Sequence, residues 1–198
     1  YEAVEAAQPA NPNLYLVSGP WFHHQQRLDG SAIGAIRFGS DTAQYGRLHV
    51  LRPFLDHYLK DDVPPMGLTR VTAFETGTNR WTGLPAWPSG CAAGCSIERQ
   101  NLYLQTGGNL RFGSSLGPAS DTGSYVSDPA KPVPYLPRPI HIGGESGETS
   151  WQTWLVSDQR DSASRPDVLS FSTPVLKEAV KISGQPIANL IASTTGTD

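Results

Sequence analysis

The spacing of apolar residues changes once along this chain, at the segment Asp61-Asp62-Val63-Pro64-Pro65. Before that segment, leucines recur at the three- and four-residue spacing of an amphipathic helix: Leu48, Leu51, Leu55 and Leu59. Ser40 or Asp41 can cap the start of this helix, and Pro53 predicts a kink or a restart within it. After the segment, short runs between turn residues predict strands. The chain therefore divides into an α/β part and a β part.

The predicted strands are short and separated by many turns. Residues 102–112 read as a hairpin with Gly107 and Gly108 at its turn. Further strands are predicted at residues 14–17, 69–76, 151–156, 168–173 and 180–183. Residues 128–139 contain five prolines, which lack the N–H donors of a sheet ladder, so this stretch cannot be a central strand.

The composition favours strands and turns over a helical bundle. The 198 residues include 20 Gly and 17 Pro, and hydrophobic residues make up 38%. We predict a mainly-β fold in which residues 67–198 form a jelly-roll β-sandwich, preceded by an α/β part over residues 1–62. We expect the sandwich to be incomplete at its C-terminal end, because the last predicted strand leaves a sheet edge unpaired.

Two adjacent histidines, His23 and His24, follow the first predicted strand and a Gly-Pro break. In an α/β-hydrolase the catalytic triad runs Ser, acid, His along the chain, and the histidine lies on a loop after a late strand. If His23 is that histidine, its serine and acid belong to chain that precedes Tyr1. The alternative, which stays open from the residues alone, is a pair of loop histidines beside a core-packed Trp21.

The residues 113–117 match the nucleophile-elbow pattern G-x-S-x-G, with Ser115 at its centre. An elbow needs a helix directly after the serine, and residues 118–123 (Pro-Ala-Ser-Asp-Thr-Gly), which follow here, cannot begin one promptly. This serine also comes after His23, which inverts the triad order. We interpret residues 113–117 as a glycine-serine loop. The remaining histidines (His49, His57 and His141) make no convincing metal site, and we predict no cofactor.

Cys91 and Cys95, the two cysteines of the chain, are spaced C-x-x-x-C. Two thiols cannot supply the four ligands of a structural zinc site, so either a local disulfide or two free thiols remain. A disulfide indicates an oxidising compartment, and we expect a periplasmic or secreted protein. The net charge of −3 and scattered basic residues argue against a nucleic-acid partner. No run approaches the roughly 20 apolar residues of a membrane span, so no membrane partner is expected.

Several longer stretches carry a resemblance to a known family. They are residues 19–23 (Gly-Pro-Trp-Phe-His), 29–35, 51–59, 79–81, 86–88 and 125–134. Together they closely resemble the α-amino-acid ester hydrolases, the β-lactam antibiotic acylases grouped with cocaine esterase, glutaryl acylase and X-prolyl dipeptidyl aminopeptidases. The likeness covers essentially the whole chain. Residues 125–129 and the closing residues 192–198 are the stretches most specific to that family.

The resemblance implies an α/β-hydrolase domain, a helical cap, a C-terminal jelly roll and a Ser-Asp-His triad. His23 falls on the family's catalytic histidine, and His24 is a second, weaker candidate. The serine, the aspartate, the oxyanion-hole tyrosine and the carboxylates that bind the substrate ammonium group all map before Tyr1. Residues 1–62 would then be the C-terminal piece of the catalytic domain, and residues 67–198 a jelly-roll domain of the X-prolyl dipeptidyl aminopeptidase type.

The implied activity belongs to a whole enzyme of which this chain is a part. That enzyme would hydrolyse or transfer the acyl group of α-amino acid esters and β-lactams through an acyl-enzyme, with His23 as general base and acid. We expect the chain alone to be inactive and its partners to be the preceding part of the enzyme, a small ester or β-lactam substrate, and further copies in a homo-oligomer. The alternatives are another acylase, esterase or X-prolyl dipeptidyl peptidase, or a stand-alone jelly-roll binding module.

Overall fold

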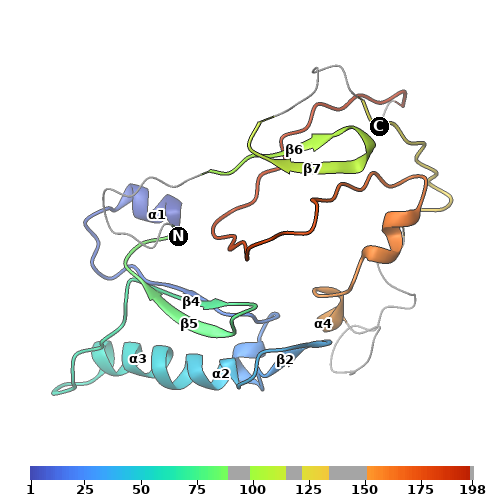
Figure 1. The fold of residues 1–198 in the computed structure, drawn as a ribbon. Coiled ribbons are helices and arrows are strands. Elements are labelled where there is room, and N and C mark those ends of the chain that lie inside the picture. Colours follow the sequence, from blue (N-terminus) through green and yellow to red (C-terminus); the bar gives the residue numbers. More distant parts are fainter. Residues whose placement is uncertain (89–98, 115–121, 134–150, 197–198) are drawn as a thin grey trace.

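The computed structural model describes residues 1–88, 99–114, 122–133 and 151–196 (Figure 1). The strands are β1 (Leu16–Ser18), β2 (Ala32–Ile33), β3 (Ile36–Arg37), β4 (Val71–Glu75), β5 (Arg80–Leu84), β6 (Leu102–Gln105) and β7 (Asn109–Phe112). The helices are α1 (Glu2–Ala7), η1 (Gln25–Arg27), α2 (Thr42–Tyr45), η2 (Gly46–Leu51), α3 (Arg52–Leu59), η3 (Thr106–Gly108), α4 (Trp151–Trp154) and η4 (Arg160–Ser164). Within the described residues only one helical stretch exceeds six residues, so the prediction of a mainly-β chain is confirmed in this coarse sense.

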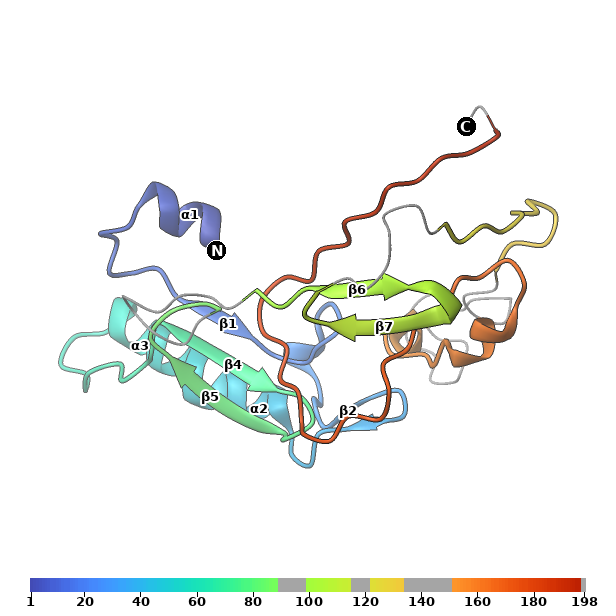
Figure 2. The same ribbon diagram turned by 45° about the horizontal axis from the view of Figure 1, so that its top comes forward.

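The principal sheet has the strand order β1-β4-β5. β1 and β4 are parallel, with Leu16 opposite Val71, whereas β4 and β5 form an antiparallel hairpin. Parallel neighbours need a crossover connection, and here the crossover contains the helices α2 to α3. These helices lie along one face of the sheet (Figures 1 and 2). The sheet therefore contains one β-α-β unit, and it includes strands that follow residue 67.

The helical stretch begins where the sequence predicted. Asp41 caps α2, because its carboxylate accepts a hydrogen bond from the backbone N–H of Gln44. The helix widens to π geometry over η2 and returns to α geometry at Arg52. In a regular α-helix the ring of Pro53 would clash with the carbonyl of His49, and a wider preceding turn relieves that clash. None of the helices in the described ranges is long and apolar enough to cross a membrane.

The helix α1, which the sequence did not predict, is anchored to the start of β4 by Arg70. The guanidinium donates to the carbonyl of Asn11 at 3.0 Å and contacts the Glu5 carboxylate at 3.4 Å. No side chain of α1 is buried. Polar contacts to Arg70 are therefore what hold this terminal helix in place.

Among the described residues, the buried core is confined to the first part of the chain. Its buried side chains are Gln25, Ile33, Phe38, Thr42, Ala43, Val50, Val71 and Thr72. An aromatic row extends this core across β4 and β5: Phe38 contacts Phe74, Phe74 contacts Trp81, and Trp81 stacks on Tyr45 at 4.9 Å. The helix and the β4-β5 hairpin thus share one core.

The second part of the chain is built around the β6-β7 hairpin. Its turn contains Gly107 and Gly108, both with positive φ (+69° and +73°), as the sequence predicted. The C-terminal segment runs beside this hairpin, since Ser172 exchanges backbone hydrogen bonds with Gly108 and Leu110. Farther along, Lys181 forms an ion pair with Glu75 of β4, which links the segment to the principal sheet.

Three predicted strands are wrong. Residues 151–154 form the helix α4, residues 168–173 contribute a single isolated bridge at Ser172, and residues 180–183 adopt no regular structure. A strand forms only where a neighbouring strand accepts and donates backbone hydrogen bonds. Among the described residues, these three segments have one such pairing, the isolated bridge between Ser172 and Asn109. The hairpins at 71–84 and 102–112 have such partners, and they form.

Candidate histidine site

The two histidines occupy the centre of a tight turn directly after β1. The backbone N–H of Gln25 donates to the carbonyl of Phe22 at 3.0 Å, which closes a four-residue turn with His23 and His24 in the middle. His24 has φ +69° and ψ −2°, the values of the third position of a type II turn, where glycine is favoured. Both imidazoles are exposed, and their ring centroids lie 3.8 Å apart. The first strand therefore delivers both side chains to the surface.

A buried glutamine lies beneath this turn. Gln25 is 2% exposed, and its side-chain amide makes three hydrogen bonds to the loop backbone. It accepts from the N–H of Phe22 at 3.2 Å and donates to the carbonyls of Asp29 and Ala32 at 3.0 and 2.8 Å. The loop from residue 22 to residue 32 is thus closed around one amide group.

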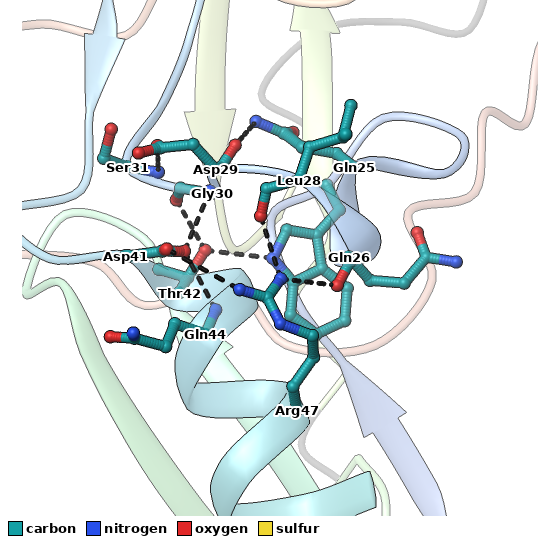
Figure 3. A network of polar contacts seen from close by, with 11 residues as sticks. Gln25, Gln26, Leu28, Asp29, Gly30, Ser31, Asp41, Thr42, Gln44 and Arg47 are labelled. Atoms are coloured by element: carbon teal, nitrogen blue, oxygen red, sulfur yellow. Dashed lines mark hydrogen bonds and ion pairs between the residues drawn. The ribbon is translucent and has the colours of Figure 1, made fainter.

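The far end of the loop is tied to the start of α2 through Gly30. Its N–H donates to Asp41 Oδ1 at 2.9 Å, and its carbonyl accepts from Thr42 Oγ1 at 2.7 Å (Figure 3). A Cβ atom at residue 30 would lie 2.4 Å from the backbone nitrogen of Ala43, so only glycine fits there. The helix cap and the histidine loop therefore share the carboxylate of Asp41.

Arg47 clamps the loop from the side of the helix. Its Nη1 atom donates to the carbonyls of Gln26 and Leu28 at 2.9 and 2.8 Å, and its Nη2 lies 3.9 Å from the Asp41 carboxylate (Figure 3). Two carbonyls bound by one guanidinium fix the short helix η1 against the surface of η2. On the same loop, hydrogen bonds from Ser31 lower the pKa of Asp29.

Trp21 fills the space between the turn and the helix. Its indole N–H donates to Thr42 Oγ1 at 2.9 Å, and its ring lies 5.8 Å from the ring of Trp81. A Cβ atom at Gly46 would lie 2.8 Å from this indole, so glycine is needed where η2 approaches it. Trp21 is half-buried in this position, between the histidine turn and the helix.

This arrangement can perform acid-base chemistry at an exposed imidazole. A hydroxyl group beside it would make a nucleophile and base pair. Within the described part of the chain, no hydroxyl or carboxylate makes a hydrogen bond to His23 or His24. The same part contains no group of three or more His, Cys, Asp and Glu side chains that could hold a metal ion.

A separate pocket of about 150 Å³ lies between the helix and the β4-β5 hairpin. Tyr45, His49, Thr72 and Trp81 are among its lining residues, and none of the lining residues comes from the loop of residues 19–32. The indole nitrogen of Trp81 is buried, and no described residue forms a hydrogen bond to it. The pocket is too small for a typical ligand and holds none of the candidate catalytic residues.

The structure brings His23 and His24 together and separates both from His49 and His57, which lie on η2 and α3. Ser115, Cys91, Cys95 and His141 fall outside the described residues. The sequence reasoning missed Gln25, Thr42 and Arg47, which hold the loop. The Asp41 cap was the one local signal that pointed to this region.

Comparison with known proteins gives related hydrolases. A cocaine esterase from Rhodococcus sp. (strain MB1 Bresler) is 29% identical over 198 residues, covering 95% of this chain and 32% of the esterase. The solved structure of an α-amino acid ester hydrolase labelled with selenomethionine is 47% identical, with a TM-score of 0.76 over 90% of this chain and 28% of that chain. An aminopeptidase from the marine sediment archaeon Thaumarchaeota archaeon is 41% identical, with a TM-score of 0.73 and the same coverage. No known family profile matches the chain.

These matches confirm the resemblance to α-amino acid ester hydrolases and cocaine esterase that the sequence indicated. The similarity includes nearly the whole chain and extends to its three-dimensional structure. The chain spans about a third or less of the length of each of these relatives.

Proposed function

We propose that this chain is the C-terminal part of a longer serine hydrolase and supplies its catalytic histidine, His23. The serine and aspartate of the triad would come from the preceding part of the same polypeptide. Coverage of only 28 to 32% of the related hydrolases supports a longer protein. In this proposal β1, the histidine loop, the helix and the β4-β5 hairpin, which share one sheet and core, complete an α/β-hydrolase domain. The later hairpin β6-β7 and the segment after it belong to a jelly roll.

The position of His23 is the observation that carries the proposal. It lies in a loop directly after β1, a strand that is paired in parallel and is followed by a helical crossover. The triad histidine of an α/β-hydrolase lies in such a loop after a late strand of the sheet. The loop is held by buried side chains, while the imidazole itself stays exposed. A fixed backbone with an exposed imidazole is the arrangement a general base requires.

In the proposed mechanism His23 takes the proton of the serine hydroxyl as the serine attacks the ester or amide carbonyl. It then gives this proton to the leaving alcohol or amine, and an acyl-enzyme remains. In the second half His23 takes a proton from a water, or from an incoming amine, as it attacks the acyl carbonyl. It then returns this proton to the serine oxygen as the acyl–serine bond breaks. The serine and the acid would have to approach from outside the described residues, since none of these forms a hydroxyl or carboxylate hydrogen bond to the imidazole.

The uncovered apolar surface of the chain also supports packing against further polypeptide. Leu51, Leu55 and Leu59, on one stripe of the helix, are all exposed. An amphipathic helix normally buries such a stripe against a core. We therefore propose that the preceding part of the enzyme covers it.

For the substrate we propose α-amino acid esters and the related β-lactam amides, with acyl transfer as well as hydrolysis. The solved α-amino acid ester hydrolase, at 47% identity, supports this choice. The second candidate is an aminopeptidase activity, which the 41% identical archaeal aminopeptidase favours. Both candidate activities use substrates that carry a free α-amino group. They differ in the leaving group, which is an alcohol for an ester and an amine for a peptide.

The test uses the full-length polypeptide and two substitutions in the same turn. His23→Ala should reduce the turnover of an amino acid ester by several orders of magnitude, because it removes the proposed base. His24→Gly is the matched control, because glycine suits a φ of +69° and the change leaves His23 in place. Full activity in the His23→Ala enzyme would overturn the proposal, and loss of activity in the His24→Gly enzyme alone would move the role to His24.

The substrate class is tested with phenylalanine methyl ester, its N-acetyl derivative and phenylalanine anilide, which changes only the leaving group of the first. The proposal predicts rapid hydrolysis of the first and a large loss with the second, which lacks a free amino group. Preference for the anilide would identify the aminopeptidase alternative. Equal rates on the first two substrates would contradict both candidates and favour a general esterase.

A further inference from the structure

We infer that Gln25 is the positioning residue of the histidine site, and that its buried amide sets the backbone that presents His23. This inference rests on the proposed function, because it assigns a role relative to the proposed general base. Gln25 does not touch the reacting atoms in this assignment; it acts through the turn that carries His23.

The contacts of Gln25 reach both ends of the loop. Its Oε1 atom accepts from the N–H of Phe22, the residue immediately before His23. Its Nε2 atom donates to the backbone carbonyls of Asp29 and Ala32, where the loop leads into the β2-β3 hairpin. Both N–H groups of the amide are used, so its donor capacity is filled. One side chain thereby fixes the distance between the start and the end of the loop.

The chemistry of the position requires an amide of this length. The loop offers one N–H and two carbonyls, so the side chain must both accept and donate. Glutamate has no donor when ionised, methionine has neither function, and asparagine is one methylene shorter. A buried amide is unfavourable unless its polar groups are bonded, and here they are. The burial and the three bonds together indicate a specific role for Gln25.

The other anchors of the loop hold different parts of it. Asp41 and Thr42 bind Gly30, and Arg47 binds the carbonyls of Gln26 and Leu28. Gln25, by contrast, bonds to the backbone directly next to His23: its buried amide accepts the N–H of Phe22. Its own backbone N–H also closes the turn around both histidines. Loss of this amide should therefore disturb the histidine more than the rest of the loop.

The test compares Gln25→Met with Gln26→Met in the full-length polypeptide, assayed with phenylalanine methyl ester. The first change keeps the approximate volume and removes all three bonds. The second is made at the exposed neighbour in the same short helix. We expect Gln25→Met to lower kcat by about 10- to 100-fold, the effect of a displaced catalytic group, with KM within about twofold. We expect Gln26→Met to have the kcat and KM of the wild-type enzyme.

The outcomes separate this inference from the proposed function. Unchanged kcat in Gln25→Met, with activity abolished in His23→Ala, overturns the role of Gln25 and leaves the proposed function standing. Activity retained in His23→Ala overturns both. A parallel rise in KM and fall in melting temperature with kcat unchanged would show that Gln25 is purely structural.

A second variant and a second measurement cover the case in which Gln25→Met does not fold. Gln25→Glu keeps the acceptor for Phe22 and loses both donors, so a reduced kcat is again expected. In the unchanged enzyme, hydrogen exchange should show the N–H of Phe22 protected, because it is bonded to the buried amide. Exchange of that N–H at the rate of an unstructured peptide would overturn the inference.

Discussion

The indole N–H of Trp21 and the hydroxyl of Thr42 form a hydrogen bond of 2.9 Å. The same hydroxyl donates to the carbonyl of Gly30, so one side-chain oxygen serves both ends of the histidine loop. Thr42 is fully buried, and it lies in the first turn of α2. The helix start therefore takes part directly in the fold of the loop that precedes it.

Thr42→Val should destabilise the protein by about 1–3 kcal/mol, because it leaves the Trp21 N–H and the Gly30 carbonyl without this partner. The urea-unfolding midpoint of the full-length polypeptide measures the effect. Thr42→Ser is the control, since it keeps the hydroxyl and both bonds. A Val variant as stable as the Ser variant would show that these two bonds contribute nothing to stability.

Gly46→Ala should destabilise the protein even though alanine favours helices. The gain in helix propensity is about 1 kcal/mol, and the clash of a Cβ atom 2.8 Å from the Trp21 ring costs about 1–3 kcal/mol. The ring cannot give way easily, because its N–H is bonded to Thr42. Thermal unfolding of Gly46→Ala and of Gln44→Ala, an exposed position of α2, checks this. Stabilisation in both variants would contradict the close packing.

The Glu75–Lys181 ion pair should make the attachment of the C-terminal segment sensitive to acid. The hydrogen bond from Lys181, followed by that from Thr78, lowers the pKa of Glu75 from its ordinary value of 4.5. Because the pKa is lower in the folded state, the stabilisation is present above about pH 4.5 and is lost as the pH falls through the folded value. Lys181→Met should remove this dependence and return the pKa of Glu75 toward 4.5.

Melting temperatures of the unchanged protein and of Lys181→Met, taken between about pH 6 and about pH 3, measure this effect. The difference between the two proteins should be largest at the upper pH and shrink as the pH falls through the lowered pKa of Glu75. Lys177→Met, at another exposed lysine of the same segment, should behave like the unchanged protein. A melting-temperature difference that keeps its full size at low pH would show that Lys181 stabilises the protein through something other than its ion pair with Glu75.

Cys91 and Cys95 are predicted to form a disulfide when the protein is produced in an oxidising compartment, in line with the periplasmic or secreted location that we expect. Alkylation before and after reduction, followed by intact-mass measurement, tests the pairing. We expect both thiols to react only after reduction. In the chain-entropy model so short a loop adds only about 2 kcal/mol. Labelling of both thiols without reductant would contradict the pairing and remove the main support for an oxidising compartment.

Elements with local signals could be predicted from the sequence. Asp41 marked the helix start through its capping chemistry, and Gly107 and Gly108 marked the β6-β7 turn through their freedom to adopt positive φ. Periodicity located the helix but did not reveal that η2 adopts π geometry. His23 could be singled out because a strand, a Gly-Pro break and a histidine follow each other directly.

Features that depend on distant partners could not be predicted. The parallel pairing of Leu16 with Val71 depends on where the crossover returns, which no local pattern specifies. Gln25 lies in a polar run and gives no sign that its side chain is buried. Residues 151–154 were wrongly expected to form a strand. Trp151 and Trp154 are three residues apart, a spacing that a helical turn also accommodates.

The helix-side anchors of the histidine loop come after it in the chain: Asp41, Thr42 and Arg47. A ribosome adds about 5–20 residues per second from the N-terminus, so His23 and Gln25 are synthesised before these helix-side anchors. In the proposed enzyme, the portion bearing the serine would be synthesised earlier still. A nascent chain would then contain its nucleophile without an oriented base, and catalysis would begin only once the helix between residues 42 and 59 had formed. The order of synthesis would keep the growing polypeptide from reacting with substrate before its fold is nearly complete.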